Sequence, residues 1–155
     1  MSDPARVVIL VGLPGSGKSF YLDKLHANAV SSDDVRRQLL DNESDQTANG
    51  AVFATVRYML RKRIELKRPI TFVDATNVTR RVRKPFIRIA KEGGCRVEAI
   101  WFDVPLAICR ERNAARHRVV PDFVLEHMAA RLVPPSLEEG FEFVERVTNG
   151  TTIPA

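Results

Sequence analysis

Apolar residues follow two different rhythms along the 155-residue chain. Compact apolar runs, rich in β-branched residues, predict buried strands at 7–11, 70–73, 95–104 and 141–147. Between these runs, apolar residues recur at helical spacing, as Phe53, Val56, Leu60 and Ile64 do. Strands that alternate with helices in this way predict an α/β fold, in which helices flank a mostly parallel sheet.

The helical spacing and the residues that interrupt it predict six helices, at 17–28, 32–40, 50–68, 79–93, 105–117 and 122–132. The hydroxyl of Ser32 is expected to cap the second helix. Pro85 falls inside the fourth, so that helix either begins only near Pro85 or bends there. The segment 30–32 is either a short strand or a loop, and the polar segment 41–49 is expected to be a surface loop.

The first strand leads into Gly12-x-x-x-x-Gly17-Lys18-Ser19, a complete phosphate-binding loop. Its glycines let the backbone curl so that successive N–H groups face an anion at the N-terminus of the next helix. Lys18 is then placed as a cation for the β- and γ-phosphates, and the Ser19 hydroxyl as a ligand to Mg²⁺. The loop therefore predicts that ATP binds through Gly12, Gly15, Ser16, Gly17, Lys18 and Ser19.

The length of the chain allows one domain, 1–155, with a substantial core. No apolar run approaches the ~20 residues of a membrane helix, and the first residues lack the apolar stretch of a signal peptide. We therefore expect a cytoplasmic protein with no membrane partner. Cys95 and Cys109 show neither metal-ligand spacing nor a CxxC pattern, so both are expected to be buried free thiols. Nothing in the sequence indicates an oligomeric state.

The formal net charge of +5 is unevenly distributed along the chain. Two predicted helices are rich in cations, which are Arg57, Arg61, Lys62, Arg63, Lys67 and Arg68 in one and Arg80, Arg81, Arg83, Lys84, Arg88 and Lys91 in the other. These basic faces are either ordinary solvated helix surface or an electrostatic footprint for a polyanion such as a nucleic acid. The C-terminal end is acidic instead.

Ligands of a parallel α/β sheet gather at the carboxyl ends of its strands. The phosphate loop follows the first strand, Asp33 and Asp34 follow the segment 30–32, and residues 74–77 follow the strand at 70–73. These three segments are therefore expected to meet at one edge of the sheet.

Four motifs, taken in order, resemble a known family. GLPGSGKS, SDDVR, DATN and the arginine-rich RERNAARHRVVP, followed by a helix, are similar to the kinase domain of bacteriophage-type polynucleotide 5′-hydroxyl kinase. The similarity runs from Val7 to roughly Leu132. Many unrelated enzymes share the phosphate loop alone, whereas far fewer families carry all four motifs in this order. The resemblance implies a P-loop kinase domain with an arginine-bearing helical lid at about 105–132.

The resemblance also implies roles for side chains outside the phosphate loop. Asp33 is implied as the general base for the acceptor hydroxyl, and Arg36, one helical turn away, as the residue that holds an acceptor phosphate. Arg112 and Arg116, four apart on a predicted helix face, resemble lid arginines that close over the transferring phosphate. Asp74 resembles a carboxylate that lies near the metal or orients a lid arginine. The catalytic candidates are Lys18, Asp33, Arg36 and Arg116, and the metal candidates are Ser19 and Asp74.

Structural alternatives stay open at several of these positions. Asp33 and Asp34 also suit the start of a helix, which is the expected role of Asp34, and the lid arginines also suit a solvated helix surface. Ser32 stands where the phage enzyme has an arginine, which removes one positive contact to the acceptor strand. No motif of the phage-type phosphatase domain follows, so kinase activity alone is expected.

Three functions are compatible with the sequence. The favoured one is an ATP-dependent kinase that phosphorylates the 5′-hydroxyl of DNA or RNA, with end repair as its purpose. Small-molecule kinases of the shikimate, gluconate and nucleoside types share the sheet and the loop. A nucleotide-binding module without phosphotransfer is the third, but such a module needs no hydroxyl base at Asp33.

Overall fold

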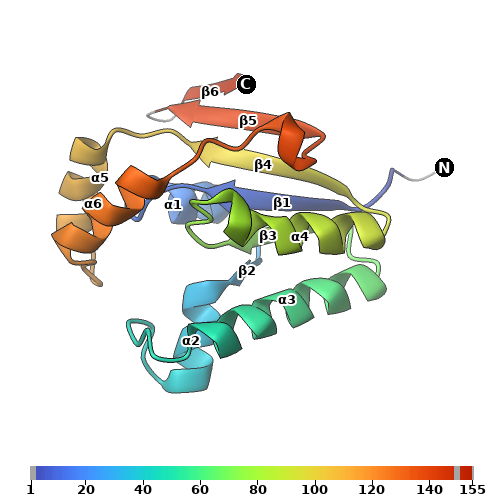
Figure 1. Ribbon diagram of the computed structural model, residues 1–155, viewed down its shortest axis with the longest axis horizontal. Helices are drawn as coiled ribbons and strands as arrows, with labels where there is room; N and C mark the ends of the chain where they lie inside the picture. The colour runs from blue at the N-terminus through green and yellow to red at the C-terminus, as the bar shows by residue number, and fades with distance from the viewer. Residues whose placement is uncertain (1–2, 149–150, 155) are drawn as a thin grey trace.

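The sheet is built around the strand that leads into the phosphate loop. Within residues 3–148 and 151–154, which this computed structural model describes, the strands are β1 (Arg6–Val11), β2 (Ala29–Ser31), β3 (Ile70–Asp74), β4 (Arg96–Phe102), β5 (Phe143–Thr148) and β6 (Thr151–Pro154). They form one sheet in the order β2-β3-β1-β4-β5-β6 (Figure 1). β1 to β5 run parallel, and β6 is antiparallel to β5. The predicted α/β class with a mostly parallel sheet is confirmed, whereas β6 lies outside every predicted element.

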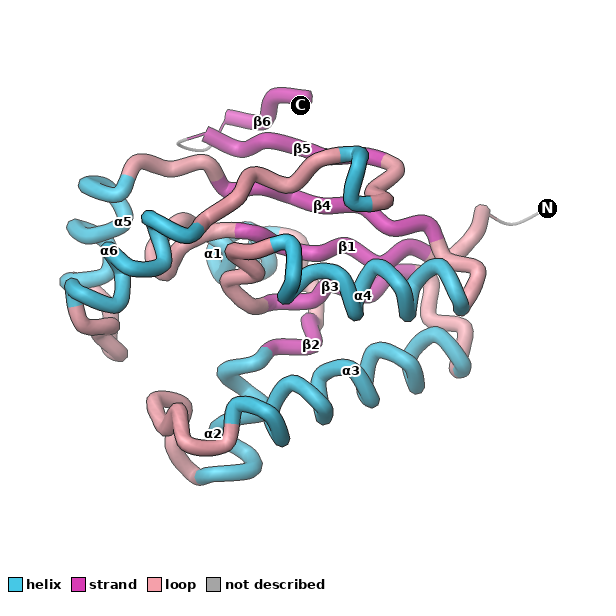
Figure 2. The backbone as a smooth tube through the Cα atoms, viewed as in Figure 1, coloured by secondary structure: helices cyan, strands magenta, loops and turns pink. Residues whose placement is uncertain are grey.

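Helices connect the strands and lie along the sheet (Figure 2). They are α1 (Lys18–Lys24), α2 (Ser32–Leu40), α3 (Asn49–Glu65), α4 (Arg80–Glu92), α5 (Leu106–Ala114) and α6 (Asp122–Arg131), and a 3₁₀ turn, η1, spans Leu137–Glu139. Three of the helices end just before a residue with positive φ, at His26 (φ 50°), Asp41 (φ 59°) and Lys67 (φ 55°). A left-handed residue cannot continue a right-handed helix. α1 and α3 are therefore shorter than predicted.

The two faces of the sheet are covered by different helices. In β1, Val7, Ile9 and Val11 point to a core shared with α2, α3 and α4. The alternate residues Val8 and Leu10 point to a second core, into which α1 packs. This alternation follows from the two-residue period of a strand. α3 and α4 lie side by side along the first face (Figure 1).

A third apolar cluster joins the lid to the phosphate loop rather than to the sheet. Leu13 of the loop packs with Val104, with Cys109 of α5 and with Leu125 of α6. α5 and α6 therefore stand together at one end of the sheet, where the β1 strand ends (Figure 2). α5 and α6 occupy the range at about 105–132 where the sequence predicts an arginine-bearing helical lid, and this segment is called the lid below.

Local chemistry at the start of two helices differs from the prediction. Ser31, rather than Ser32, caps α2, because its Oγ accepts a hydrogen bond of 3.3 Å from the backbone N of Asp34. α4 begins at Arg80 and includes Pro85, so the alternative in which it begins near Pro85 is wrong. The segment 30–32 contributes to β2, a real three-residue strand.

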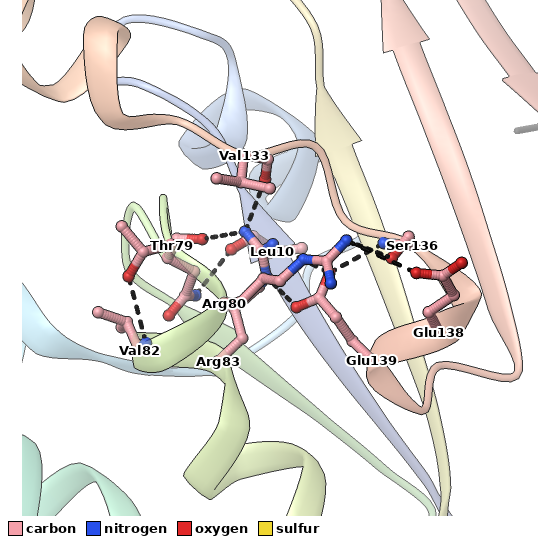
Figure 3. A network of polar contacts seen from close by, with 10 residues as sticks. Leu10, Thr79, Arg80, Val82, Arg83, Val133, Ser136, Glu138 and Glu139 are labelled. Atoms are coloured by element: carbon pink, nitrogen blue, oxygen red, sulfur yellow. Dashed lines mark hydrogen bonds and ion pairs between the residues drawn. The ribbon is translucent and has the colours of Figure 1, made fainter.

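Arg83 lies in a basic helix but is completely buried, with a relative exposure of 0%. Its Nε and Nη2 donate to the two carboxylate oxygens of Glu139 at 2.8 and 3.0 Å (Figure 3). Its Nη1 donates to the carbonyl oxygens of Asn77 and Val133, both at 2.9 Å. Including Arg83 among cations available to a polyanion was therefore wrong. The side chain instead joins α4 to η1 and to the segment that leaves the lid.

The two thiols agree with the prediction from the sequence. Cys95 and Cys109 are free and buried. Burial raises the pKa of both thiols. In the parts of the chain that the structure describes, no helix is both long enough and apolar enough to span a membrane.

Candidate functional site

The phosphate loop has the strand, loop and helix context that its motif requires. Gly15 and Gly17 have φ values of 83° and 104°, which favour glycine. A Cβ at Gly15 would lie 2.6 Å from the backbone oxygen of Cys109, and one at Gly12 would lie 2.5 Å from Ser16 Oγ. The loop is therefore packed directly against α5, and larger residues at these positions would force it apart.

Lys18 turns back onto its own loop. Its Nζ donates to the carbonyl oxygens of Gly12 at 2.8 Å and Leu13 at 3.0 Å. Removal from water lowers the pKa of Lys18 to about 8, although the nearby Asp74 acts in the opposite direction. Close by, the Oγ of Ser16 is buried without any hydrogen-bond partner in the described structure. A cation and an unpartnered hydroxyl therefore face the place where a polyphosphate would lie.

Asp33 and Arg36 form a rigid pair at the start of α2. Arg36 Nη1 donates to Asp33 Oδ1 at 3.0 Å, and Nη2 donates to Asn49 Oδ1 at 3.0 Å. The arginine is buried, with an exposure of 5%, and its Nε has no partner among the described residues. The predicted placement of Arg36 one turn from Asp33 is confirmed. Sequence reasoning missed Asn49, whose role depends on the position of α3 beside α2.

A second arginine, Arg118, reaches the same carboxylate from the lid. Its Nη1 lies 2.9 Å from Asp33 Oδ2, and its Nε donates to Ser44 Oγ at 3.0 Å. Sequence reasoning named neither Arg118 nor Ser44 as a site residue. Its position in the arginine-rich RERNAARHR segment was the signal that pointed to it.

The lid arginines are arranged differently from the prediction. α5 ends at Ala114, so Arg116 lies in the loop after the helix and does not share a helix face with Arg112. Asn113 closes this loop, because its side chain donates to the Val120 oxygen at 2.7 Å and accepts from the Val120 N at 3.1 Å. Arg112 and Arg116 nevertheless both line the cavity described below.

The end of β3 brings the DATN motif beside the phosphate loop. The Thr76 oxygen accepts from the Gly12 N at 3.0 Å, and Asn77 Nδ2 donates to the Leu10 oxygen at 2.7 Å. Burial raises the pKa of Asp74, and the nearby Lys18 partly offsets this effect. The three segments predicted to meet at one sheet edge therefore do so.

Two cavities meet at this edge, with volumes of about 1080 Å³ and 380 Å³. The larger one is lined by every predicted site residue other than Gly12. Both cavities are lined by Ser19, Asp33, Asp74, Arg116 and Arg118. A volume of several hundred Å³ or more with few convergent polar groups is typical of a small-molecule site.

The residues present fit ATP and Mg²⁺. The cradle of glycines, the cation of Lys18 and the unpartnered Ser16 hydroxyl match a triphosphate. No group of three or more His, Cys, Asp or Glu side chains with metal-ligand geometry occurs among the described residues. Mg²⁺ needs no such group, because it is usually held by one or two protein oxygens, here Ser19 and Asp74, together with phosphate and water.

The fold and the phosphate loop define a P-loop domain of the kinase type. A family model described as AAA domain matches residues 7–135, and the chain belongs to this family. Solved structures share the fold: a chain of the Pnkp1/Rnl/Hen1 RNA repair complex aligns with a TM-score of 0.74 and 20% identity, over 99% of this chain and 49% of that one.

Curated relatives are distant but cover nearly the whole chain. The bifunctional polynucleotide phosphatase/kinase of Schizosaccharomyces pombe is 26% identical over 153 residues, or 94% of this chain and 34% of that protein. The L-seryl-tRNA(Sec) kinase of Methanococcus maripaludis is 23% identical over 154 residues, or 94% of this chain and 59% of that protein. The chain thus spans only part of the length of either relative.

Proposed function

We propose that this protein is an ATP-dependent phosphotransferase that moves the γ-phosphate to a hydroxyl, most favourably the 5′-hydroxyl of DNA or RNA. One observation carries the proposal: the larger cavity holds the phosphate loop together with the carboxylate of Asp33 and the guanidinium of Arg36. A nucleotide-binding module needs the loop but has no use for an acceptor-side carboxylate and arginine.

The donor side of the cavity binds and polarises ATP. Lys18 exchanges its hydrogen bonds to the carbonyl oxygens of Gly12 and Leu13 for hydrogen bonds to the β- and γ-phosphates. The phosphate oxygens are anionic and therefore stronger acceptors than the neutral carbonyl oxygens. Mg²⁺, when bound, neutralises charge on the phosphate oxygens. Arg112 and Arg116 supply fixed positive charge from the lid as negative charge develops on the transferring group.

The acceptor side orients the hydroxyl and its neighbouring phosphate. Asp33 accepts the hydroxyl proton as the new bond to phosphorus forms. Arg36 is already held in place by Asp33 and Asn49, so its remaining donor capacity can bind a phosphate with little loss of side-chain freedom.

The lid supplies an apolar wall to the same cavity. The lining includes Val120, Pro121, Val124 and Met128. An apolar wall beside a phosphate-binding arginine suits a nucleotide, whose base has apolar faces. The similarity to a polynucleotide phosphatase/kinase supports the same acceptor class.

The test is to offer radiolabelled ATP to 5′-hydroxyl oligonucleotides of DNA and RNA and to a panel of small alcohols. We expect label in the oligonucleotides. Binding of a 5′-hydroxyl oligonucleotide should weaken with salt by a log–log slope of about −0.7 per phosphate contacted. Arg36→Ala should reduce transfer and flatten this slope, whereas Arg88→Ala, which removes an exposed charge that lines neither cavity, should not.

Two outcomes contradict the proposal. Label in an uncharged small alcohol, with none in oligonucleotides, assigns the site to a small-molecule kinase. ATP binding without transfer to any hydroxyl assigns it to a binding module.

A further inference from the structure

Arg118 is a lid residue that makes two polar contacts with residues across the cleft. Its Nη1 lies 2.9 Å from Asp33 Oδ2 at the start of α2, and its Nε donates to Ser44 Oγ in the loop after α2 at 3.0 Å. Its side chain is 20% exposed, although it comes from a surface loop. The arginine therefore bridges the lid and the acceptor side while no substrate separates them.

Both oxygens of the Asp33 carboxylate are engaged by guanidinium groups. Arg36 takes Oδ1 from within the same helix and is also fixed by Asn49. Arg118 takes Oδ2 from a loop between α5 and α6, and its second bond is to one exposed hydroxyl. Of the two arginines, Arg118 is therefore the one that another group can more easily displace from the Asp33 carboxylate.

The pair also stands where the two cavities adjoin, since Asp33 and Arg118 each line both of them. A hydroxyl that approaches Asp33 from either cavity meets the Arg118 guanidinium. Any molecule that uses Asp33 as its proton acceptor must share the carboxylate with Arg118 or displace it.

We propose that Arg118 is a specificity-determining residue that occupies the Oδ2 atom of Asp33, a carboxylate that is 49% exposed, until a phosphate-bearing acceptor displaces it. This inference rests on the proposed phosphotransferase function. Water has no anionic group with which to replace the carboxylate that the guanidinium gives up. An acceptor with a phosphate beside its hydroxyl offers such a group, so the exchange costs it less.

The reaction that Arg118 suppresses is ATP hydrolysis. In that step the oxygen of water bonds to the γ-phosphorus, and the bond from this phosphorus to the β,γ-bridging oxygen breaks. ADP leaves with the electron pair of that bond. One proton of the water passes to Asp33 and then to solvent. Transfer to an acceptor follows the same balance, with the alcohol oxygen in place of the water oxygen.

The variant Arg118→Gln keeps a hydrogen-bond donor but removes the charge. We expect the ratio of ATP hydrolysis to transfer to rise about fivefold or more, equivalent to about 1 kcal/mol of barrier. Ser44→Ala, which removes one of the two contacts, should raise the ratio less. Arg131→Gln is the matched control, because it removes an exposed lid charge that does not line either cavity, and it should leave the ratio unchanged.

Hydrogen–deuterium exchange of the ATP-free protein tests the bridge without any activity. Arg118→Gln should increase exchange in segments 41–49 and 115–121, and Arg131→Gln should not. Unchanged exchange overturns the bridge. An unchanged ratio, or equal loss of hydrolysis and transfer, overturns this role and makes Arg118 a positioning residue for the transferring phosphate. If the unmodified protein transfers phosphate to no acceptor, the proposed function fails, and exchange and acceptor-free hydrolysis still decide whether Arg118 restrains Asp33 as a base.

Discussion

Lys18 is a half-buried cation and Arg83 a fully buried one, and the fold surrounds the two differently. Arg83 has a carboxylate that matches its planar fork, and two carbonyl oxygens complete its hydrogen bonds (Figure 3). Lys18 has only two carbonyl oxygens from its own loop, and its pKa is lowered to about 8. The first charge is satisfied by the protein, whereas the second is left for a ligand.

The cleft around Lys18 also contains buried polar atoms that have no hydrogen-bond partner among the described residues. The cleft that holds Lys18 also contains Ser16 Oγ and Arg36 Nε, which are buried without partners in the described structure. A buried polar atom without a partner costs roughly 1–3 kcal/mol. Both cleft atoms can gain partners when an anionic ligand fills the cleft, whereas Arg83 already has its partners, so each region should respond differently to substitution.

The largest expected effect is on catalysis at Lys18. Lys18→Ala should lower phosphotransfer by roughly 10³–10⁵-fold, the range known for a cation on the transferring phosphate. The thermal midpoint at pH 7 should not fall, because the removed ammonium was only weakly partnered. Transfer from labelled ATP and a thermal melt measure both effects, with the exposed Lys84→Ala as the control. Near-normal turnover in Lys18→Ala would mean that ATP binds elsewhere.

The opposite result is expected at Arg83. Arg83→Leu leaves Glu139 as a buried, unpaired charge and should cost about 3–5 kcal/mol of unfolding free energy. The double variant Arg83→Leu/Glu139→Leu should recover most of this loss, since no charge then stays buried. Urea denaturation measures both, with the exposed Arg88→Leu as the control. A small loss in Arg83→Leu, with no recovery in the double variant, would remove the contrast with Lys18.

Asp33 lies between the two extremes, because arginines pair it while it remains 49% exposed. Asp33→Asn should slow transfer by at least ~10²-fold, the usual scale for loss of a general base. Isothermal titration should find ATP affinity nearly unchanged. Asp34→Asn, in the same turn of α2 but paired with Arg37, is the matched control and should retain activity. Equal rates for the two variants would give Asp33 a purely structural role.

The smallest effect is a pH dependence that sharpens the comparison. ATP binds the protonated form of Lys18, which falls from about nine tenths of molecules at pH 7 to about one tenth at pH 9 when the pKa is about 8. ATP affinity should therefore weaken by roughly tenfold between these pH values. Titration of a non-hydrolysable analogue with Mg²⁺ measures this. Lys18→Arg should abolish the dependence, because arginine stays charged; a dependence that persists would belong to another group.

The ATP-binding side of the site could be predicted because its residues are close together in the sequence. The phosphate loop is contiguous, and its apolar strand and periodic helix confirm it without distant contacts. The meeting of Asp33, Asp74 and the loop at one sheet edge follows from a rule for parallel sheets. The ends of α1 and α3 were not predictable, because the left-handed residues that end them are histidine and lysine rather than glycine.

Contacts between distant segments account for the other differences. Arg83 has the spacing of a surface cation, and only Glu139, 56 positions away, explains its burial. Arg118 acquires its role from Asp33 and Ser44, across the cleft. Arg116 was assigned to a helix that ends two residues before it, since nothing in RNAAR marks an end without the fold around Asn113.

The position of β1 between β3 and β4 in the sheet affects how the protein folds while it is being synthesised. Arg6 pairs with Ile70 on one side and with Arg96 on the other, so both neighbours of the first strand are made much later. At ~5–20 residues per second, the roughly 60 residues between β1 and β3 take about 3–12 s to synthesise. During that interval the apolar run Val7–Val11 has no sheet partner and is exposed to aggregation. The two strands that flank β1 are thus made well after it, so the sheet that positions the phosphate loop can form only late in synthesis of this domain.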